Sequence, residues 1–363
     1  MDKKNIIDGN LDVSEEGIIA LLGEDVLDLL LCEHAYEFHN KRSKEKHHII
    51  WATDNYEKEG KGFNFSDEIG IENITGEYYK LIRPRVTKSR EEQEKRTRDK
   101  AEVFTPSWVC NAQNNLVDEA WFGRKDVFNK ETFENGIHRW NTAEEKIEFP
   151  ENKSWQEYVT DNRLEMSCGE APYLVSRYDT TTGEYFENLQ ERVGILDRKL
   201  RVVGENVSNI DEWYLWAFNA IKSTYGFEWQ GDNLLLAREA VLCTFIDYFK
   251  DFAMKIGINK SIPPKSHVKY VANIVSWNIF QMDGIKMVLP MTCHNKIIKA
   301  ERQLSLFETN DTEDKIISCE GCVKNDVHRH NGIYQVVADW DKTKWDLKEK
   351  PIEITVFHKL IKQ

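Results

Sequence analysis

The chain has 363 residues, of which 40% are hydrophobic, 11% aromatic and 31% charged, and its 49 Lys and Arg against 62 Asp and Glu give a formal net charge of −13. This composition supplies enough apolar material for a large core and excludes an intrinsically disordered chain. The acidic balance excludes a protein that coats nucleic acid by bulk charge, so any contact with DNA must be local.

The N-terminal residues and the cysteines indicate the cellular compartment. Residues 1–5 lead into no sustained apolar run, and no stretch of the sequence approaches the roughly 20 apolar residues that a membrane helix needs. The seven cysteines are an odd number and do not resemble a disulfide framework. We therefore expect a cytoplasmic protein that makes no contact with membranes.

The first hundred residues predict a small α+β segment. Residues 13–31 carry Ile, Leu and Val at nearly helical spacing, which predicts one or two short amphipathic helices. Residues 48–53 form a compact apolar run that suits a strand. Residues 80–100 are rich in Lys and Arg, and this run can be either a solvated charged helix or a local patch that binds nucleic acid.

The character of the sequence changes at residue 102. Thr105 and Pro106 precede a segment that predicts a helix from Ser107 to about Glu119, because Pro is tolerated at the first helical turn and Ser or Thr can cap it. The N-terminus of this helix would face whatever lies in front of Phe104. Residues 121–160 are aromatic without clear periodicity and predict an irregular connection.

A first loop of small residues carries a signal for ligand binding. Residues 164–166 predict a strand end, residues 167–172 a tight turn and residues 173–178 the start of a helix. Such a turn lets the backbone approach a ligand closely at the carboxyl edge of a sheet. The turn has a single glycine, Gly169, so a purely structural turn explains it equally well.

Two acidic positions further along the chain suit a nucleoside. Glu228 ends a second expected strand, where a carboxylate can bind ribose hydroxyls and Trp229 can lie against adenine. A surface carboxylate beside a core tryptophan is the alternative. An apolar, strand-like run from residue 271 ends at Asp283, which could accept the exocyclic amine of adenine, although Asp-Gly is also a common turn signal.

The order of these motifs resembles that of the adenine-N6 DNA methyltransferases of restriction-modification systems. Residues 102–106 resemble the family's N-terminal Thr-Pro motif, and residues 164–174 resemble its DPACGSGxFL loop, which holds the methionine part of S-adenosylmethionine. Residues 225–228 resemble its YGIE ribose-binding strand end, and residues 278–285 its NIxxGDxL adenine contact. The similarity covers about residues 51–290 and is to proteins described as restriction endonuclease subunit M.

This resemblance implies a fold, a cofactor and a division of the chain. The fold would be α/β, a Rossmann-like S-adenosylmethionine-dependent methyltransferase core over residues 101–290, preceded by the α+β segment 1–100 and followed by the C-terminal segment 291–363. The resemblance also implies the residues that bind S-adenosylmethionine, with Trp229 added from its place beside Glu228: Phe104, Thr105, Glu165, Cys168, Gly169, Glu228, Trp229 and Asp283.

Departures from the family pattern are informative. Glu165 stands where the family has Asp, and Glu170 replaces a small residue, which would bring a carboxylate near the cofactor. The interval between Gly169 and Glu228 is longer than one helix, which predicts an inserted helical segment over about residues 185–210.

The largest departure concerns catalysis. The family holds the flipped-out target amine with an (Asn/Asp/Ser)-Pro-Pro-(Tyr/Phe) motif, and here the only Pro-Pro pair is Pro263 and Pro264, upstream of Asp283 and without a following aromatic. We therefore expect a modification subunit that acts on DNA and needs a second subunit or a downstream segment for catalysis. The alternatives are a non-catalytic DNA-binding, regulatory or interaction subunit, and an acidic DNA mimic.

The C-terminal segment contains a candidate zinc site. Cys319 and Cys322 form a Cys-x-x-Cys pair, and His328 and His330 follow closely, so that the four supply the ligand set of a structural zinc knuckle. Cys293 and its neighbour His294 are spare ligands. An unoccupied thiol pair and a redox pair are the alternatives. Residues 333–340 then predict a strand.

Overall fold

The computed structural model describes residues 15–40, 45–100, 102, 105–298 and 315–361. In these ranges the chain mixes helices with small sheets, and none of the sheets closes into a barrel. None of the helices described there is long and apolar enough to cross a membrane. The largest hydrophobic core combines buried residues from Ile18 to Trp340, so it draws on the N-terminal, middle and C-terminal parts of the chain.

The largest sheet has three parallel strands in the order β5 (Arg163–Met166), β6 (Thr224–Glu228) and β7 (Ile279–Gln281). Glu165 lies opposite Gly226, and Gly226 lies opposite Ile279. Because parallel strands run in one direction, their carboxyl ends meet at the same edge of the sheet. The strand ends predicted at residue 166 and at Glu228 are thereby confirmed and lie side by side.

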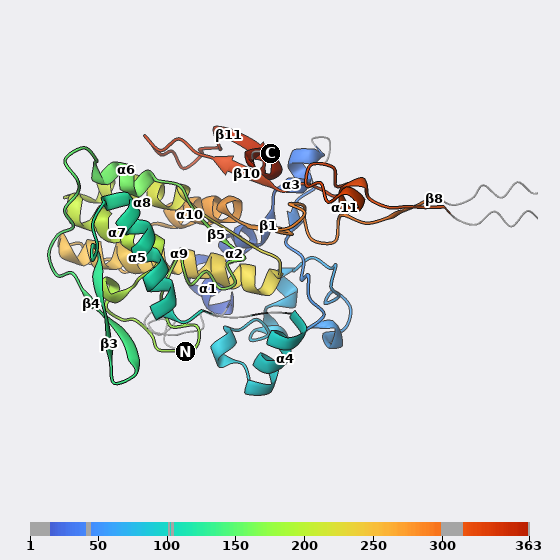
Figure 1. The fold of residues 1–363 in the computed structure, drawn as a ribbon, viewed down its shortest axis with the longest axis horizontal. Helices are drawn as coiled ribbons and strands as arrows, with labels where there is room; N and C mark the ends of the chain where they lie inside the picture. Colours follow the sequence, from blue (N-terminus) through green and yellow to red (C-terminus); the bar gives the residue numbers. More distant parts are fainter. Residues whose placement is uncertain (1–14, 41–44, 101, 103–104, 299–314, 362–363) are drawn as a thin grey trace, which may run out of the picture.

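Helices make both connections between these strands (Figure 1). The chain passes from β5 to β6 through α7 (Ile195–Asn206) and α8 (Ile210–Lys222), which confirms the predicted inserted helical segment. It passes from β6 to β7 through α9 (Gly231–Lys255) and α10 (Lys265–Asn278).

The N-terminal segment packs on this core. Its elements are α1 (Glu15–Leu22), α2 (Glu24–Leu31), β1 (Cys32–Glu33), α3 (Ala35–His39), β2 (His47–His48) and α4 (Arg90–Lys100). The helices α1 and α2 confirm the prediction for residues 13–31. Of the strand predicted over residues 48–53, only the end of β2 and an isolated bridge at Ile50 are present. The backbone N–H and C=O of Ile50 bond to the side-chain amide of Gln281, so they are not available to the backbone of a neighbouring strand.

A buried arginine joins the N-terminal segment to the sheet. The guanidinium of Arg238, on α9, has no solvent exposure and donates to four backbone carbonyls. Two belong to the N-terminal segment, Leu30 (2.5 Å) and Cys32 (3.0 Å), and two to α10 and β7, Ser276 (3.0 Å) and Ile279 (2.7 Å). Burial lowers the pKa of Arg238 to about 10.

The remaining elements lie around the core. They are α5 (Ser107–Phe122), the antiparallel pair β3 (Asn129–Glu134) and β4 (Ile137–Thr142), α6 (Trp155–Thr160), β8 (Lys296–Ile298), β9 (Lys315–Ile317), α11 (Glu320–Lys324), β10 (Val336–Asp339) and β11 (Glu353–Val356). The helix α5 confirms the prediction from Ser107, and β10 confirms part of the strand predicted over residues 333–340. Figure 1 shows the arm of β8 and β9 projecting away from the body.

Three predicted elements are wrong. Residues 121–160 are a hairpin and a helix, not an irregular connection, and the hairpin turns at Asn135 and Gly136, both with positive φ. Residues 172–174 form a turn and residues 175–178 do not continue it as a helix, because the N–H of Ser176 bonds to the carboxylate of Asp197 (2.8 Å). Residues 271–278 belong to the helix α10 and not to a strand.

Candidate functional site

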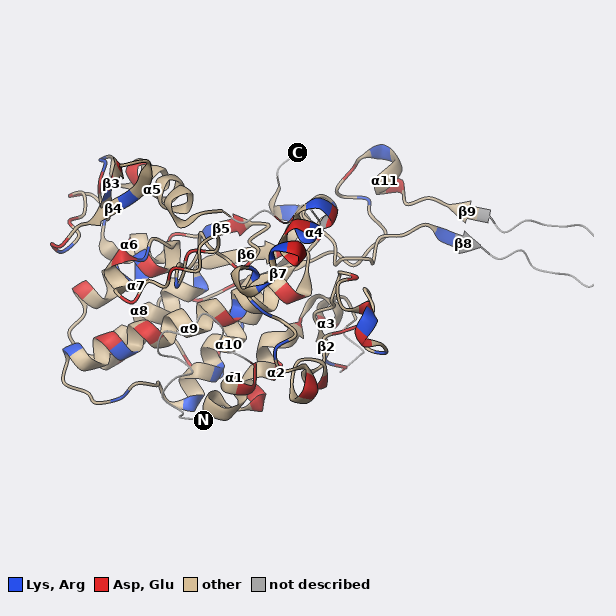
Figure 2. Cartoon of the chain, turned by 90° about the horizontal axis from the view of Figure 1, so that it is seen from below, with Lys and Arg blue, Asp and Glu red and all other residues tan. Residues whose placement is uncertain are grey.

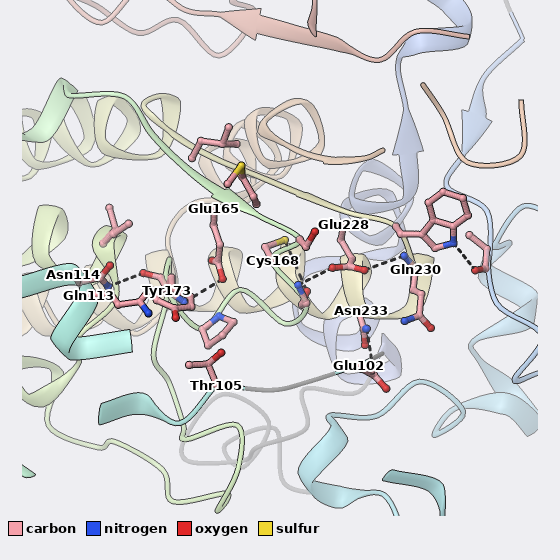
Figure 3. A pocket seen from close by; sticks show the side chains of 18 of the residues that line it. Glu102, Thr105, Gln113, Asn114, Glu165, Cys168, Tyr173, Glu228, Gln230 and Asn233 are labelled. Atoms are coloured by element: carbon pink, nitrogen blue, oxygen red, sulfur yellow. Dashed lines mark hydrogen bonds between the residues drawn. The ribbon is translucent and has the colours of Figure 1, made fainter. Parts of the chain in front are cut away.

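A cavity of about 880 Å³ opens at the carboxyl ends of β5 and β6 (Figure 3). Six of the eight residues predicted to bind a cofactor line it: Thr105, Glu165, Cys168, Gly169, Glu228 and Trp229. Phe104 lies outside the described residues. Asp283 is not among the described residues that line the cavity.

The buried carboxylate of Glu228 binds the loop of small residues that follows β5, near the centre of the cavity. Glu228 is 8% exposed, and its two carboxylate oxygens accept from the N–H of Gly169 (2.8 Å) and of Gln230 (3.2 Å). Burial raises the pKa of Glu228 although these N–H donors oppose the shift. A carboxylate has about four acceptor sites, so Glu228 keeps capacity for hydroxyl groups of a ligand.

The loop lies directly on β6. The N–H of Cys168 donates to the carbonyl of Phe227 (2.8 Å), and a Cβ on Gly226 would approach the Sγ of Cys168 to 3.3 Å. Gly169 has a φ of +54°, in the left-handed region that glycine adopts without strain. These two glycines therefore allow the loop to pass close to the strand and present its backbone to the cavity.

Two glutamates fix the loop from either side. Glu165 accepts from the N–H of Leu174 (3.1 Å), and burial raises the pKa of Glu165 well above its usual range. Glu170 turns away from the cavity, where its carboxylate accepts from the N–H of Arg85 (2.7 Å) and the hydroxyl of Tyr178 (2.5 Å). Glu165 therefore lines the cavity, whereas Glu170, which was expected to bring a carboxylate there, is not among the described residues that line it.

The helix α5 lines one end of the cavity with side chains that sequence reasoning missed, Gln113 and Asn114. The amide of Asn114 donates to the carbonyl of Tyr173 (3.0 Å), which ties the helix to the loop. The first N–H of the helix, that of Ser107, donates to the carboxylate of Asp179 (2.7 Å). This N–H group therefore already has a hydrogen-bond acceptor within the protein and is not available to a ligand.

The N-terminal segment supplies the opposite wall, although sequence reasoning placed this segment outside the core domain. Ala52 and Phe65 line the cavity, and the carbonyl of Ala52 accepts from the indole N–H of Trp229 (3.0 Å). The carbonyl of Trp229 in turn accepts from the amide of Gln281 (2.8 Å). Trp229 is therefore held on both its side chain and its backbone.

A buried ion network joins α4 to this wall. Arg96 is 5% exposed and bonds to Glu102 (2.5 Å) and to Asp232 (2.7 Å) at the start of α9. The pKa of Asp232 is lowered to about 2. Burial alone would raise this pKa, but the positive charges of Arg96 and Lys88 have the larger effect. Figure 2 shows that α4 carries both basic and acidic side chains along its length. Of the run 80–100, Arg96 is therefore a structural residue and not part of a solvated face.

Asp283 serves a turn. Its Oδ1 accepts from the N–H of Ile285 (3.0 Å) and of Lys286 (3.0 Å). The Asp-Gly pair thus forms the turn that was the alternative to a contact with adenine, and the contact with adenine stays a prediction.

A second site lies in the C-terminal segment. The Sγ atoms of Cys293, Cys319 and Cys322 and the Nδ1 of His330 all lie within 4.8 Å of one another, so this cluster could hold a metal ion. Cys293 takes the place that the sequence analysis gave to His328, whose Nδ1 lies 2.7 Å from that of His358.

The thiols of the cluster influence one another's ionisation. Burial acts against ionisation of Cys319, but N–H donors of Cys322 and Asn331, with His330 and Cys293, lower its pKa to about 6. Burial and its two cysteine neighbours raise the pKa of Cys293 to about 12. Cysteine binds a metal ion as the thiolate, so occupation of this cluster by a metal would release protons.

Comparison with known proteins assigns neither of these two sites. A scan against protein-family models, a search of curated proteins and a search of solved structures each found no match to this chain. The function of the two sites therefore follows only from their own geometry and chemistry.

Proposed function

We propose that the cavity binds S-adenosylmethionine and that the chain is the cofactor-binding subunit of a DNA adenine-N6 methyltransferase in a restriction-modification or phage-defence system, with a Rossmann-like core. The bond between Gly169 and Glu228 carries this proposal, because it brings a small-residue loop and a carboxylate suited to ribose against one cavity. The volume of about 880 Å³ lies within the range usual for small-molecule sites, roughly 300 to 1,000 Å³.

The residues of the cavity would bind and orient the cofactor. The bound cofactor supplies an already activated methyl group, so the protein's task is alignment and the exclusion of water. The loop at Gly169 offers close backbone approach, and Glu228 offers acceptors for the ribose hydroxyls. Trp229 and Phe65 supply aromatic surface for the adenine.

The target amine needs a group that holds it, and the Pro263-Pro264 pair does not supply one at the cavity. Pro263 and Pro264 directly precede α10, whose other end at Asn278 leads into β7, and neither proline is among the described residues that line the cavity. The proposal therefore includes DNA and a second subunit or a downstream segment that carries the amine-holding motif. The same observation favours the alternative, a methyltransferase-fold protein that binds the cofactor and methylates nothing.

Calorimetry with S-adenosylmethionine tests the binding proposal. We expect the wild-type chain to bind and Glu228→Ala to weaken binding at least tenfold, because it removes an acceptor for donors on the ligand. Asp283→Asn is the matched control and should leave the affinity within about twofold, since Asp283 serves a turn. Absence of binding to the wild-type chain, or an unchanged affinity in Glu228→Ala, would contradict the proposal.

Transfer of labelled methyl groups to DNA separates the catalytic from the non-catalytic alternative. Label should reach adenine when the chain is combined with a subunit that carries an Asn-Pro-Pro-Tyr motif, and the chain by itself should transfer none. Transfer by the isolated chain would show that it has its own amine holder. Cofactor binding without transfer in either case would favour the non-catalytic alternative.

We also infer that the second site holds zinc. Five of the separations between the four ligand atoms, from Cys293 to Cys319, Cys322 and His330 and from His330 to Cys319 and Cys322, are 3.5 to 3.6 Å. A tetrahedron with Zn–S bonds of roughly 2.3 Å has edges of roughly 3.8 Å, and the shorter Zn–N bond of a histidine shortens the edges to that ligand. Three cysteines and one histidine form a closed set, which is typical of a structural zinc site.

Metal analysis of two variants tests this set of ligands. We expect about one zinc per wild-type chain and a loss of most of it in Cys293→Ser, which removes one of four ligands. His328→Asn should keep its zinc, because His328 lies outside the cluster. Equal loss from both variants, or a wild-type chain purified without zinc that does not take it up, would refute the assignment.

A further inference from the structure

A groove on the surface of the N-terminal segment is lined by three arginines. It has a volume of about 370 Å³ and lies between Arg85 and one face of α4, which contributes Arg90, Gln93, Glu94, Thr97 and Arg98. Three arginines and one glutamate give this lining a formal charge of +2, although the whole chain has a net charge of −13. A local excess of positive charge on an acidic protein favours an anionic ligand.

The spacing of residues along α4 separates this arginine groove from the buried side of the helix. The groove-lining residues of α4 recur at intervals of three and four positions, so they share one face. Arg96 lies on another face, where its guanidinium pairs with Glu102 and Asp232 inside the protein. The buried side therefore fixes α4 to the body of the protein, and the groove faces solvent.

The guanidinium groups of Arg90 and Arg98 are accessible to a ligand, since their side chains are 91% and 76% exposed. Each pairs with an exposed carboxylate of the same helix, Arg90 with Glu94 (2.8 Å) and Arg98 with Asp99 (2.9 Å). Exposed pairs of this kind contribute little to stability. A phosphate, which binds arginine through two parallel hydrogen bonds, can therefore replace the carboxylate.

The arginine groove adjoins the cavity. Thr97 lines the groove, Glu102 lines the cavity, and the hydroxyl of Thr97 lies 3.1 Å from the carbonyl oxygen of Glu102. Along α4, Arg98 follows Arg90 after a rise of about 12 Å, over which one strand of B-DNA presents about three or four phosphates. A strand that contacts both arginines would therefore pass beside the cavity.

We infer that the arginine groove binds the phosphate backbone of DNA, with Arg90 and Arg98 as its contacts, and so holds the duplex beside the cavity. This inference rests on the proposed function, which includes DNA as a partner. Of the two interpretations that the sequence allows for residues 80–100, it selects the patch that binds nucleic acid and restricts this patch to one face of α4. Contacts with phosphate carry no sequence information, so the groove positions DNA without choosing the target.

Fluorescence anisotropy of a labelled DNA duplex, titrated with the full chain at a series of salt concentrations, tests the groove. We expect the wild-type chain to bind, and Arg90→Gln and Arg98→Gln each to lower the slope of log affinity against log salt by about 0.9, the value of one lost phosphate contact. This loss corresponds to binding about eightfold weaker at roughly 0.1 M salt. Duplexes of unrelated sequence should show the same loss.

Lys95→Gln is the matched control, because Lys95 is an exposed cation of the same helix that is not among the described residues lining the groove. It should leave the slope unchanged and the affinity within about twofold. No binding by the wild-type chain, unchanged slopes in both arginine variants, or an equal loss in Lys95→Gln would overturn the groove, whatever the calorimetry with S-adenosylmethionine shows. Binding of DNA through both arginines by a chain that does not bind S-adenosylmethionine would keep the groove and overturn the proposed function.

Discussion

Asp197 is one of several buried acids whose raised pKa makes the stability of this protein depend on pH. Asp197 on α7 has no solvent exposure, and burial raises its pKa from 3.8 to about 6. Between these values the native state binds more protons than the unfolded state, so the contribution of Asp197 to stability is full below about pH 4 and is lost as the pH rises through 6.

Asp197→Asn should remove this part of the pH dependence. Relative to the wild type, the variant should gain about 2 to 3 kcal/mol in unfolding free energy between pH 4 and pH 7, since each unit of pKa shift is worth about 1.4 kcal/mol. Urea denaturation at a series of pH values measures this difference. A difference that stays constant across the series would show that Asp197 is not the group responsible.

The elements that could be predicted are those whose ends carry strong local signals. The ends of the strand before Ser167 and of the strand ending at Glu228 could be predicted because small or turn-forming residues follow each strand. The hairpin was missed although Asn135 and Gly136 are the turn pair that favours tight hairpins, because its strands expose polar residues on both faces.

The helix α10 was mistaken for a strand because its apolar residues are nearly continuous. Val268, Val271, Ile274 and Val275 are buried at helical spacing, but the run from Val271 continues through Ile279 and Phe280 into β7, so the helical period was hidden. Short apolar runs of this kind are ambiguous until the packing partners are known. Here the partners are α2, α9 and the sheet.

Only part of the candidate sites could be predicted, because local sequence does not encode which distant segments meet. Gly169 and Glu228 follow from their own loops, whereas Phe65 reaches the cavity through the packing of the N-terminal segment. In the metal cluster, proximity in sequence favoured His328. The bridge between Val288 and Tyr334 instead brings Cys293 beside the other ligands.

At the scale of the whole molecule, the metal cluster stands apart from the main core. The buried residues of that core include Ile279 and Ala338 but none of the described residues between them. The four ligands, from Cys293 to His330, all belong to that intervening stretch. The cluster is therefore expected to organise the arm and not the body of the protein.

Removal of metal should accordingly release the arm and leave the body folded. After treatment with a chelator we expect limited proteolysis to cut between Cys293 and His330, while the main thermal transition shifts by only a few degrees, or about 1 kcal/mol. Calorimetry and mass spectrometry of the fragments measure the two effects. Collapse of the main transition on metal removal would show instead that the cluster supports the whole fold.

The carbonyl cage around Arg238 makes the first hundred residues inseparable from the remainder of the chain. A shortened chain that began after them would retain this cation but lose two of its four acceptors, the carbonyls of Leu30 and Cys32. The guanidinium of Arg238 would then be a buried charge with only two of its hydrogen bonds. The loss of folding free energy would be larger than that from a substitution at the protein surface. The N-terminal segment and the remainder of the chain therefore have to be kept together in any engineered variant. A variant with a different N-terminal segment needs new hydrogen-bond acceptors for the guanidinium of Arg238.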